Sequence, residues 1–336
     1  MQVVRICALV LAIFSFSGCS SNPVDAPPAT IPPAQAADAP PVVAEPAGAV
    51  YPLRSDAYAA NFDPVTGSLA VLGEGPAEAS VLTVVSPTGA TREVALPGAA
   101  RAMTGDDDGR VYLATRGGYL TVDLASGATT PISVEGRQDT DFTAIARRSD
   151  GRFVLGSADG AVYTLSSEAT VGAELKVFAR VDALVTQGNT AVVLDRGQTS
   201  VTTVSEDGTQ VGQALRAGQG ATSIAADPVG RILVTDTRGG ELLVFGIDPL
   251  ILRQRYPVHD APYGLAGSST LAWVSQTASN TVVGYDLGTG IPVEKVRYRT
   301  VHQPNSLAYD ERSGTLYVVS GSGAGVQVIP NAAVPA

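Results

Sequence analysis

A pattern of strands and turns that recurs along the chain constrains the fold more than any other feature of the sequence. Residues 221–245 read ATSIAADPVGRILVTDTRGGELLVF: a short apolar segment, a turn that ends in Gly230, a second apolar segment, a polar turn, and a third segment of alternating character. The same order recurs in residues 101–124, 142–165 and 305–329, and in a weaker form in 58–85, 182–204 and 263–286. Each copy predicts three short β-strands.

The copies follow one another at a nearly constant spacing. The position of Ile224 is occupied in the seven copies by Ala60, Met103, Ile145, Leu184, Ile224, Leu265 and Leu307. The intervals between these residues are 43, 42, 39, 40, 41 and 42, a regularity that unrelated hairpins would not keep. A period near 40 with several short strands per unit is typical of the blades of a β-propeller.

A blade requires four strands, and a fourth strand-like segment follows most copies. These segments are TREVAL, TTPISV, ELKVF, TQVGQAL, LRQRYPV and VEKVRYR. The last copy ends after its third strand, GVQVI, whereas GAVYPLR at residues 48–54 precedes the first copy without a partner. We therefore predict an all-β fold, a seven-bladed β-propeller whose N-terminal strand closes the last blade. Six blades are the alternative, because the first and fourth copies are ragged.

The repeat resembles those of the YVTN and NHL-like families of bacterial propellers. The resemblance rests on DPVGRILVTD, GTLYVVSG and the inner-strand openings APYGLA and QPNSLA, and it covers about residues 49–330. It implies the propeller fold. It leaves the function open, because these families include binding scaffolds, assembly factors and a few enzymes.

The N-terminal region has the features of an export signal. An apolar run at residues 6–16 follows Arg5 and is too short to span a bilayer comfortably. The FSGC sequence that follows resembles the bacterial lipobox, whose cysteine becomes lipidated, although Phe16 stands where that motif usually has Leu. We predict a lipoprotein signal peptide at residues 1–18 and lipidation of Cys19; an ordinary secretory cleavage site is the alternative. Together with the composition, this resembles the conserved envelope lipoproteins of high-GC Gram-positive bacteria and places the chain on the extracytoplasmic face of the cell membrane.

Composition further divides the chain. Residues 20–48 hold 8 of the 22 prolines and no aromatic residue, so they bury too little apolar surface to offset the entropy of ordering. We expect a lipidated Cys and a disordered Pro/Ala-rich tether at residues 19–48, and the propeller at 49–336. Beyond the signal, Cys19 is the one cysteine in the sequence, which excludes an internal disulfide. The net charge of −10 and the lack of a basic run argue against nucleic acid as a partner.

The loops that enter the inner strands form one face of a propeller, and that face is the expected ligand site. Two positions before each Ile224 equivalent, the copies place Tyr58, Arg101, Thr143, Asp182, Thr222, Tyr263 and Asn305. Their chemical variety at a repeated position predicts a ring of ligand-binding side chains at the mouth of the central channel. We therefore expect a scaffold that binds a protein, a peptide or a cell-envelope ligand, with no metal and no cofactor.

Catalysis is the alternative function. His259 and His302 precede the inner strands of adjacent copies, and histidine is suited to general-base chemistry and metal ligation. Some lyases with related repeats use a channel-side histidine and magnesium, so the resemblance allows a metal-assisted lyase or hydrolase. Against it, PYG and PNS stand where those lyases have PHG. Asp139 and Asp141 on the channel side are candidates for contact with a cation or a basic partner.

Overall fold

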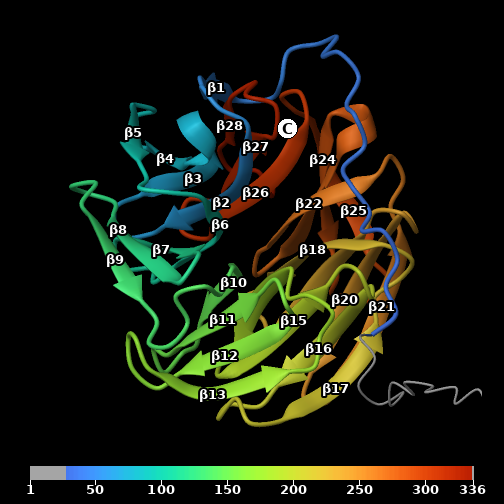
Figure 1. Cartoon of the computed structure of the whole chain (residues 1–336). Coiled ribbons are helices and arrows are strands. Elements are labelled where there is room, and N and C mark those ends of the chain that lie inside the picture. Colours follow the sequence, from blue (N-terminus) through green and yellow to red (C-terminus); the bar gives the residue numbers. More distant parts are fainter. Residues whose placement is uncertain (1–27, 335–336) are drawn as a thin grey trace, which may run out of the picture.

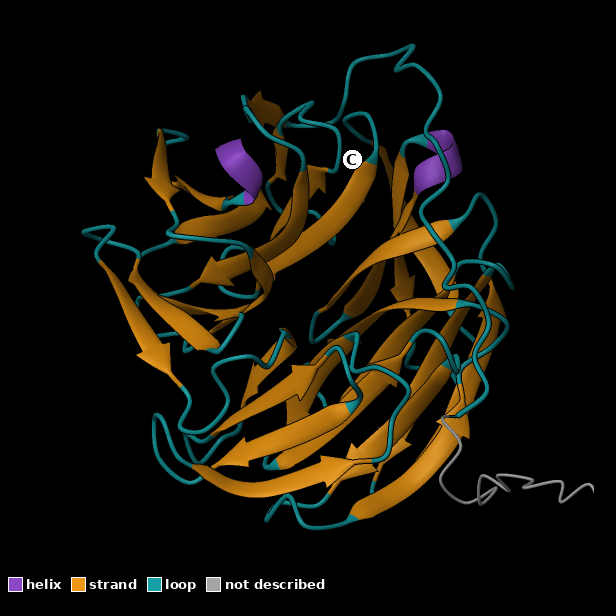
Figure 2. Cartoon of the chain, in the orientation of Figure 1, coloured by secondary structure: helices purple, strands orange, loops and turns teal. Residues whose placement is uncertain are grey.

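The computed structural model describes residues 28–334. Within this range the chain forms seven antiparallel four-stranded sheets arranged in a ring (Figure 1). Two short 3-10 helices, η1 (Pro76–Glu78) and η2 (Thr277–Ser279), lie in loops between strands (Figure 2). The predicted seven-bladed β-propeller is confirmed, and the six-bladed alternative is wrong. Among the described residues, no helix has the length and apolar character needed to cross a membrane.

The first three blades each contain four consecutive strands, numbered from the inside of the ring outward. Blade one contains β2 (Ala57–Asp63), β3 (Ser68–Glu74), β4 (Ser80–Val85) and β5 (Thr91–Ala95). Blade two contains β6 (Ala100–Gly105), β7 (Arg110–Thr115), β8 (Gly118–Asp123) and β9 (Thr129–Ser133). Blade three contains β10 (Phe142–Arg147), β11 (Phe153–Ser157), β12 (Ala161–Leu165) and β13 (Val171–Lys176).

Blades four to six repeat this order. Blade four contains β14 (Ala183–Gln187), β15 (Thr190–Asp195), β16 (Ser200–Val204) and β17 (Val211–Arg216). Blade five contains β18 (Ala221–Ala226), β19 (Arg231–Asp236), β20 (Glu241–Ile247) and β21 (Leu250–Pro257). Blade six contains β22 (Pro262–Gly267), β23 (Leu271–Gln276), β24 (Thr281–Asp286) and β25 (Val293–Arg299).

Blade seven joins the two ends of the folded chain. Its inner strands are β26 (Pro304–Asp310), β27 (Thr315–Ser320) and β28 (Val326–Ile329). The outer strand is β1 (Ala49–Tyr51), which pairs antiparallel with β28, so that Val50 lies opposite Gln327. The predicted closure by the N-terminal strand is therefore confirmed.

The core lies between the blades. The second strands are apolar on both faces: on β3, Leu69 and Val71 pack toward blade seven, whereas Ala70 and Leu72 pack toward blade two. Side chains alternate across a strand, so each sheet presents two apolar surfaces. In the described residues, one hydrophobic cluster fills each of the seven interfaces between neighbouring blades. Trp273 is fully buried between blades six and seven and stacks on Tyr309, as expected for a core residue.

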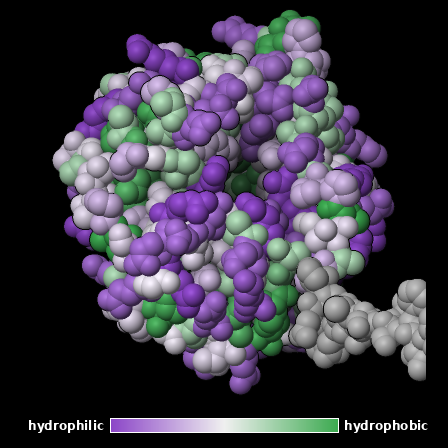
Figure 3. All heavy atoms as spheres, in the orientation of Figure 1, coloured by the Kyte–Doolittle hydropathy of each residue, from purple (hydrophilic) through white to green (hydrophobic). Residues whose placement is uncertain are grey.

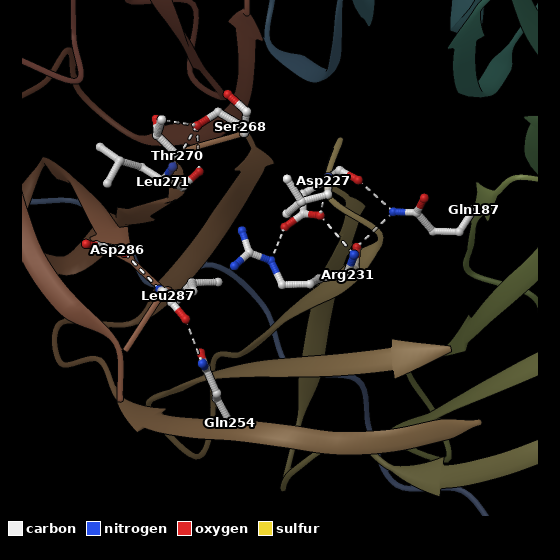
Figure 4. A network of polar contacts seen from close by, with 12 residues as sticks. Gln187, Asp227, Arg231, Gln254, Ser268, Thr270, Leu271, Asp286 and Leu287 are labelled. Carbon is white, nitrogen blue, oxygen red and sulfur yellow. Dashed lines mark hydrogen bonds and ion pairs between the residues drawn. The ribbon is translucent and has the colours of Figure 1, made fainter. Parts of the chain in front are cut away.

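The turn between the first and second strands of each blade begins at a polar residue. Three positions after the Ile224 equivalents stand Asp63, Asp106, Arg148, Gln187, Asp227, Ser268 and Asp310. Asp227 Oδ1 accepts hydrogen bonds from Val229 N at 3.1 Å and Arg231 N at 2.8 Å, so its carboxylate caps its own turn (Figure 4). Gln187 Nε2 donates to the carbonyl of Asp227 at 2.7 Å and thereby ties blade four to blade five. This position is structural.

Residues 28–47 depart from the expected disordered tether. They cross the face formed by the loops that enter the inner strands, over blades four to seven (Figure 1). Composition had suggested disorder because the segment has too little apolar surface to build a core, but its backbone groups form hydrogen bonds to loops of the propeller. Residues 1–27, and with them the predicted signal peptide and Cys19, lie outside the described residues.

A buried amide supports the closure of the ring beside the pairing of β1 with β28. The Gln327 side chain is fully buried; its Nε2 donates to the carbonyls of Ala47 at 2.7 Å and Arg299 at 2.9 Å, and its Oε1 accepts from Val301 N at 3.1 Å. Gln327→Ala removes these bonds and leaves buried polar groups unpaired. We expect the free energy of unfolding to fall by about 2–3 kcal/mol, measured by equilibrium chemical denaturation.

The matched control is Gln210→Ala, at an exposed glutamine whose side chain has no such partners. It should change the stability by less than about 0.5 kcal/mol. An equal effect of the two substitutions would contradict the role of Gln327 in closure.

Candidate functional site

A cavity of about 410 Å³ lies where the inner strands of the blades converge. All seven equivalents of Ile224, from Ala60 in blade one to Leu307 in blade seven, line it. This agreement confirms the register of the repeat that was derived from the sequence. Figure 3 shows a hollow near the centre of the ring, with hydrophobic atoms at its base and hydrophilic residues around it.

Six of the seven predicted ring residues line this cavity. They are Tyr58, Arg101, Asp182, Thr222, Tyr263 and Asn305. The seventh, Thr143, does not line it: the side chain is buried and its hydroxyl donates to the carbonyl of Val181 at 2.5 Å, in the next blade. A short hydroxyl side chain can donate its hydrogen bond to a neighbouring backbone carbonyl, and the hydroxyl then no longer faces the cavity.

The two tyrosines of the ring differ in how they are held. The Tyr58 hydroxyl lies 2.7 Å from Ser80 Oγ and donates to the carbonyl of Ala100 at 2.9 Å, and burial raises its pKa. Tyr263 is fixed through its backbone, whose carbonyl accepts from Thr235 Oγ1 at 2.9 Å. Both side chains present aromatic surface at the cavity, and Tyr58 is 41% exposed.

Side chains of both charges lie at the rim of the cavity. Arg101 is exposed, and its Nε lies 3.8 Å from Asp141 Oδ1, a loose pairing that leaves the guanidinium free to contact a ligand. Asp182 accepts from Arg196 N at 2.7 Å and from Arg180 Nε at 3.2 Å. Burial raises the pKa of Asp182, and the hydrogen bond from Arg196 N and the nearby Arg180 charge act in the opposite direction.

Arg196 is a cavity residue that the sequence analysis missed. It lies in the loop between β15 and β16, outside the repeated inner-strand position on which the prediction rested. Its main-chain amide contacts Asp182, so the loop and the ring meet at this point. The remaining ring residues are polar and neutral: Thr222 bonds to Thr237 Oγ1 at 2.6 Å, and Asn305 Oδ1 accepts from Gln303 Nε2 at 3.0 Å.

The two histidines lie on the predicted face but are not engaged with each other. His259 is exposed, and its carbonyl accepts from Gln276 Nε2 at 2.9 Å. His302 Nδ1 lies 2.8 Å from Ser322 Oγ, and its Nε2 lies 3.1 Å from the carbonyl of Ala39. Neither lines the central cavity. In residues 28–334, no group of three or more His, Cys, Asp or Glu residues is placed to hold a metal ion.

The two acidic candidates, Asp139 and Asp141, differ in their contacts. Asp141 contacts Arg101 at the rim, whereas Asp139 accepts a hydrogen bond from Arg116 Nη1 at 2.9 Å through its backbone carbonyl. The GDDDGR segment forms the turn between β6 and β7, where Asp106 Oδ1 accepts from two backbone amides. That turn, between β6 and β7, lies on the face opposite the ring residues.

Together these groups make a cavity with an apolar base and a rim that carries opposite charges, amide and aromatic surface. Such a site suits a ligand that inserts an apolar group and places charged or polar groups at the mouth. It lacks the assembled nucleophile and base that a hydrolytic centre requires among the described residues.

No protein-family model matches the chain, and no curated protein matches its sequence. Solved structures do match. The chain is similar to a streptogramin B lyase structure, with a TM-score of 0.69 and 10% identity over 85% of this chain and 97% of the other. It is similar to virginiamycin B lyase from Staphylococcus aureus, with a TM-score of 0.66 and 10% identity over 82% and 95%. The WD40 repeats of RRP9 give a TM-score of 0.68 and 16% identity over 85% and 98%.

At these identities the similarity shows the fold alone. The matched proteins include lyases and WD40 repeats, so the same ring of blades carries different functions. The function of this chain must be argued from its own cavity and loops.

The raised pKa of Asp182 gives a testable pH dependence. Because burial disfavours the charged carboxylate, the folded protein holds this proton to higher pH than the unfolded chain. The contribution of Asp182 to stability is therefore lost as the pH rises from the unfolded pKa through the folded one. We expect Asp182→Asn to gain stability relative to the native chain across that window, measured by denaturation at several pH values.

An NMR titration of the side-chain carboxyl carbon tests the same assignment directly. Arg180→Ala should raise the pKa of Asp182 further, because a favourable charge is removed. Asp207, an exposed residue of the turn between β16 and β17 whose pKa is lowered to about 2 by hydrogen bonds, is the internal control and should not shift. An Asp182 pKa below the ordinary value of about 3.9 would contradict this account.

Proposed function

We propose that this protein is a membrane-anchored, extracytoplasmic β-propeller that binds a protein, a peptide or a cell-envelope ligand at its central cavity and the surrounding loops. One observation carries the proposal. The repeat brings six polar or aromatic residues of different chemistry to one cavity whose base is apolar.

A comparison of two repeated positions supports this interpretation. The polar residues that begin the turns on the opposite face use their side chains on their own turn or on the next blade, as Asp227 and Gln187 do. At the cavity, Arg101 is 54% exposed and holds only a loose ion pair. Charged side chains that the fold does not use are the ones available to a ligand.

The anchor is proposed from the sequence. The short apolar run and the lipobox-like FSGC support lipidation of Cys19 and a place on the outer face of the cell membrane. A single acyl chain holds a protein only marginally at a membrane, whereas two or more chains hold it stably. We propose that this anchor keeps the propeller at the envelope, where its ligand is found.

A metal-assisted lyase or hydrolase that uses His259 or His302 is the second candidate. It draws on the similarity to the two lyase structures. In this chain both ring nitrogens of His302 already have partners, one of them the carbonyl of Ala39. A role of His302 in catalysis would therefore require Ala39 and its neighbours to leave the face first. We favour the binding scaffold.

The decisive experiment compares two arginines of the same blade. Arg101 lies at the cavity, and Arg110 is exposed on the opposite face. In detergent-solubilised membranes of the native bacterium, we expect the full chain to co-purify with a reproducible partner. Arg101→Ala and Tyr263→Ala should reduce recovery of that partner at least tenfold, about 1.4 kcal/mol, and Arg110→Ala should leave it unchanged.

Circular dichroism and thermal denaturation of each variant check that the propeller remains folded. Recovery that survives both cavity substitutions would refute the cavity as the binding site.

The two candidate functions also differ in metal content. For the scaffold we expect no stoichiometric divalent ion by inductively coupled plasma analysis of protein dialysed against magnesium and zinc. The enzyme would be supported instead if the native chain held one bound ion per chain and the His302→Ala chain held none. His259→Ala, at the second candidate histidine in the adjacent blade, is tested in the same way.

A further inference from the structure

Residues 28–40 occupy a groove on the face of blades four to seven. The strap groove is the surface that holds this segment: the loops that follow β15, β19 and β23 and the loop that enters β26 supply Arg196, Arg238, Asn280 and His302, and Gly220 before β18 lies beside Ala34. In Figure 1 the segment is the blue chain that passes in front of the yellow and orange blades before it reaches β1. It is neither strand nor helix.

The groove contacts the backbone of this segment with a series of side-chain donors. The donors are Arg238 Nη2 to the carbonyl of Pro32 (2.7 Å), Arg196 Nη2 to Ala34, Gln303 Nε2 to Ala37 (3.0 Å), His302 Nε2 to Ala39 (3.1 Å) and Asn280 Nδ2 to Pro40 (2.6 Å). Acceptors meet the amides of Ile31, Ala37 and Ala39 through Gly197 O (2.8 Å), Thr277 Oγ1 (3.2 Å) and Gln303 Oε1 (2.9 Å). The hydrogen bonds thus go to the peptide backbone and not to side chains of the segment.

This pattern of donors matches a proline-rich chain. Proline has no amide hydrogen, so a proline-rich peptide presents more acceptors than donors, and an extended polyproline conformation leaves its carbonyls open to outside partners. The groove has the complementary excess: it offers five side-chain donors to the carbonyls of the segment and three acceptors to its amides. A groove that recognises an ordinary β-strand would instead alternate donors and acceptors.

The burial of the segment repeats every third residue from Pro28 to Gln35, whereas Ala36, Ala37 and Ala39 beyond it are all half-buried. Pro28 and Ile31 are half-buried and Ala34 is 7% exposed, and the residues between them are exposed. Three residues per turn is the period of the polyproline helix. Ala34 also packs closely against Gly220, because a Cβ added to Gly220 would lie only 3.0 Å from the Cβ of Ala34.

We propose that the strap groove is a binding site for extended proline- and alanine-rich peptides, with residues 28–40 as its resident ligand. An unoccupied groove takes such a peptide from another chain in the same orientation, through the same donors. The site is separate from the ligand proposed for the central cavity, although Arg196 borders both. Binding of peptide here does not require that the cavity binds anything.

The test displaces the resident segment within the full chain. Ala34→Phe places a large side chain at the most buried position, where there is no room for it, and should release the segment. Gln35→Phe introduces the same residue one position away, where the side chain faces solvent. Ala37→Phe, at a half-buried residue whose amide donates to Thr277 Oγ1, gives an independent second variant should the first one fold poorly.

The probe is a fluorescent synthetic peptide with the sequence of residues 28–40, PATIPPAQAADAP, followed by anisotropy. An occupied groove reduces the apparent affinity by the fraction of chains that are free. We expect Ala34→Phe and Ala37→Phe chains to bind the peptide at least about tenfold more tightly than the native and Gln35→Phe chains. Hydrogen exchange should show the Ala37 and Ala39 amides protected in the native chain and fast in Ala34→Phe.

Two results would overturn the proposal. The first is fast exchange of these amides in the native chain, which would mean that the segment does not occupy the groove. The second is a released segment whose chain fails to bind the peptide. Arg101→Ala combined with Ala34→Phe should bind the peptide as Ala34→Phe does, which separates a failure of this site from a failure of the cavity.

Discussion

The two apolar faces of every blade are the constraint on which the rest of the structure depends. Leu69 and Val71 on one face of β3, and Ala70 and Leu72 on the other, each require a neighbouring sheet. A row of such sheets would leave an apolar surface exposed at either end. Closing the row into a ring removes both ends, and the pairing of β1 with β28 holds it closed. The central cavity, the ring of side chains and the strap groove all exist because the ring closes.

Closure also divides the polar residues into two kinds. On the face of the first turn, Asp106 and Asp227 are used by the backbone around them. On the opposite face, the inner strands converge and the side chains of Arg101 and Asn305 meet open space. The same repeated unit therefore gives one face that is fixed by its own hydrogen bonds and one whose side chains vary from blade to blade.

The fold could be predicted from the sequence because it depends on the spacing of the repeats and on the order of apolar segments and turns within each repeat. The spacing of the Ile224 equivalents and the unpaired segment before the first copy were enough to predict seven blades and their closure. The site was predicted only in part. Thr143 bonds to a carbonyl of the next blade, and no feature of the repeat indicates that contact. Arg196 reaches the cavity from a loop outside the repeated position.

The course of residues 28–47 could not be read from composition for a related reason. Low apolar content shows that a segment cannot build a core of its own. It does not show whether another part of the chain supplies donors for its carbonyls. Here those donors are side chains from blades four to seven, among them Arg196, Asn280 and Gln303, which are far apart in the sequence. Such a groove becomes visible only when the blades are assembled.

Arg196 contacts both the strap and the cavity, and Gln303 links the strap to the cavity residue Asn305, which limits how strongly the two sites can influence each other. Arg196 lines the cavity and donates to the carbonyl of Ala34; Gln303 donates both to Ala37 and to Asn305 at the rim. A cavity ligand that takes over the Arg196 guanidinium removes one charged hydrogen bond from the strap, about 1.5–3 kcal/mol at most. Linkage is reciprocal, so release of the strap would favour that ligand by the same free energy. The coupling is thus bounded at about 10- to 150-fold, large enough for peptide exchange in the groove to modulate the cavity and too small to make either site depend on the other.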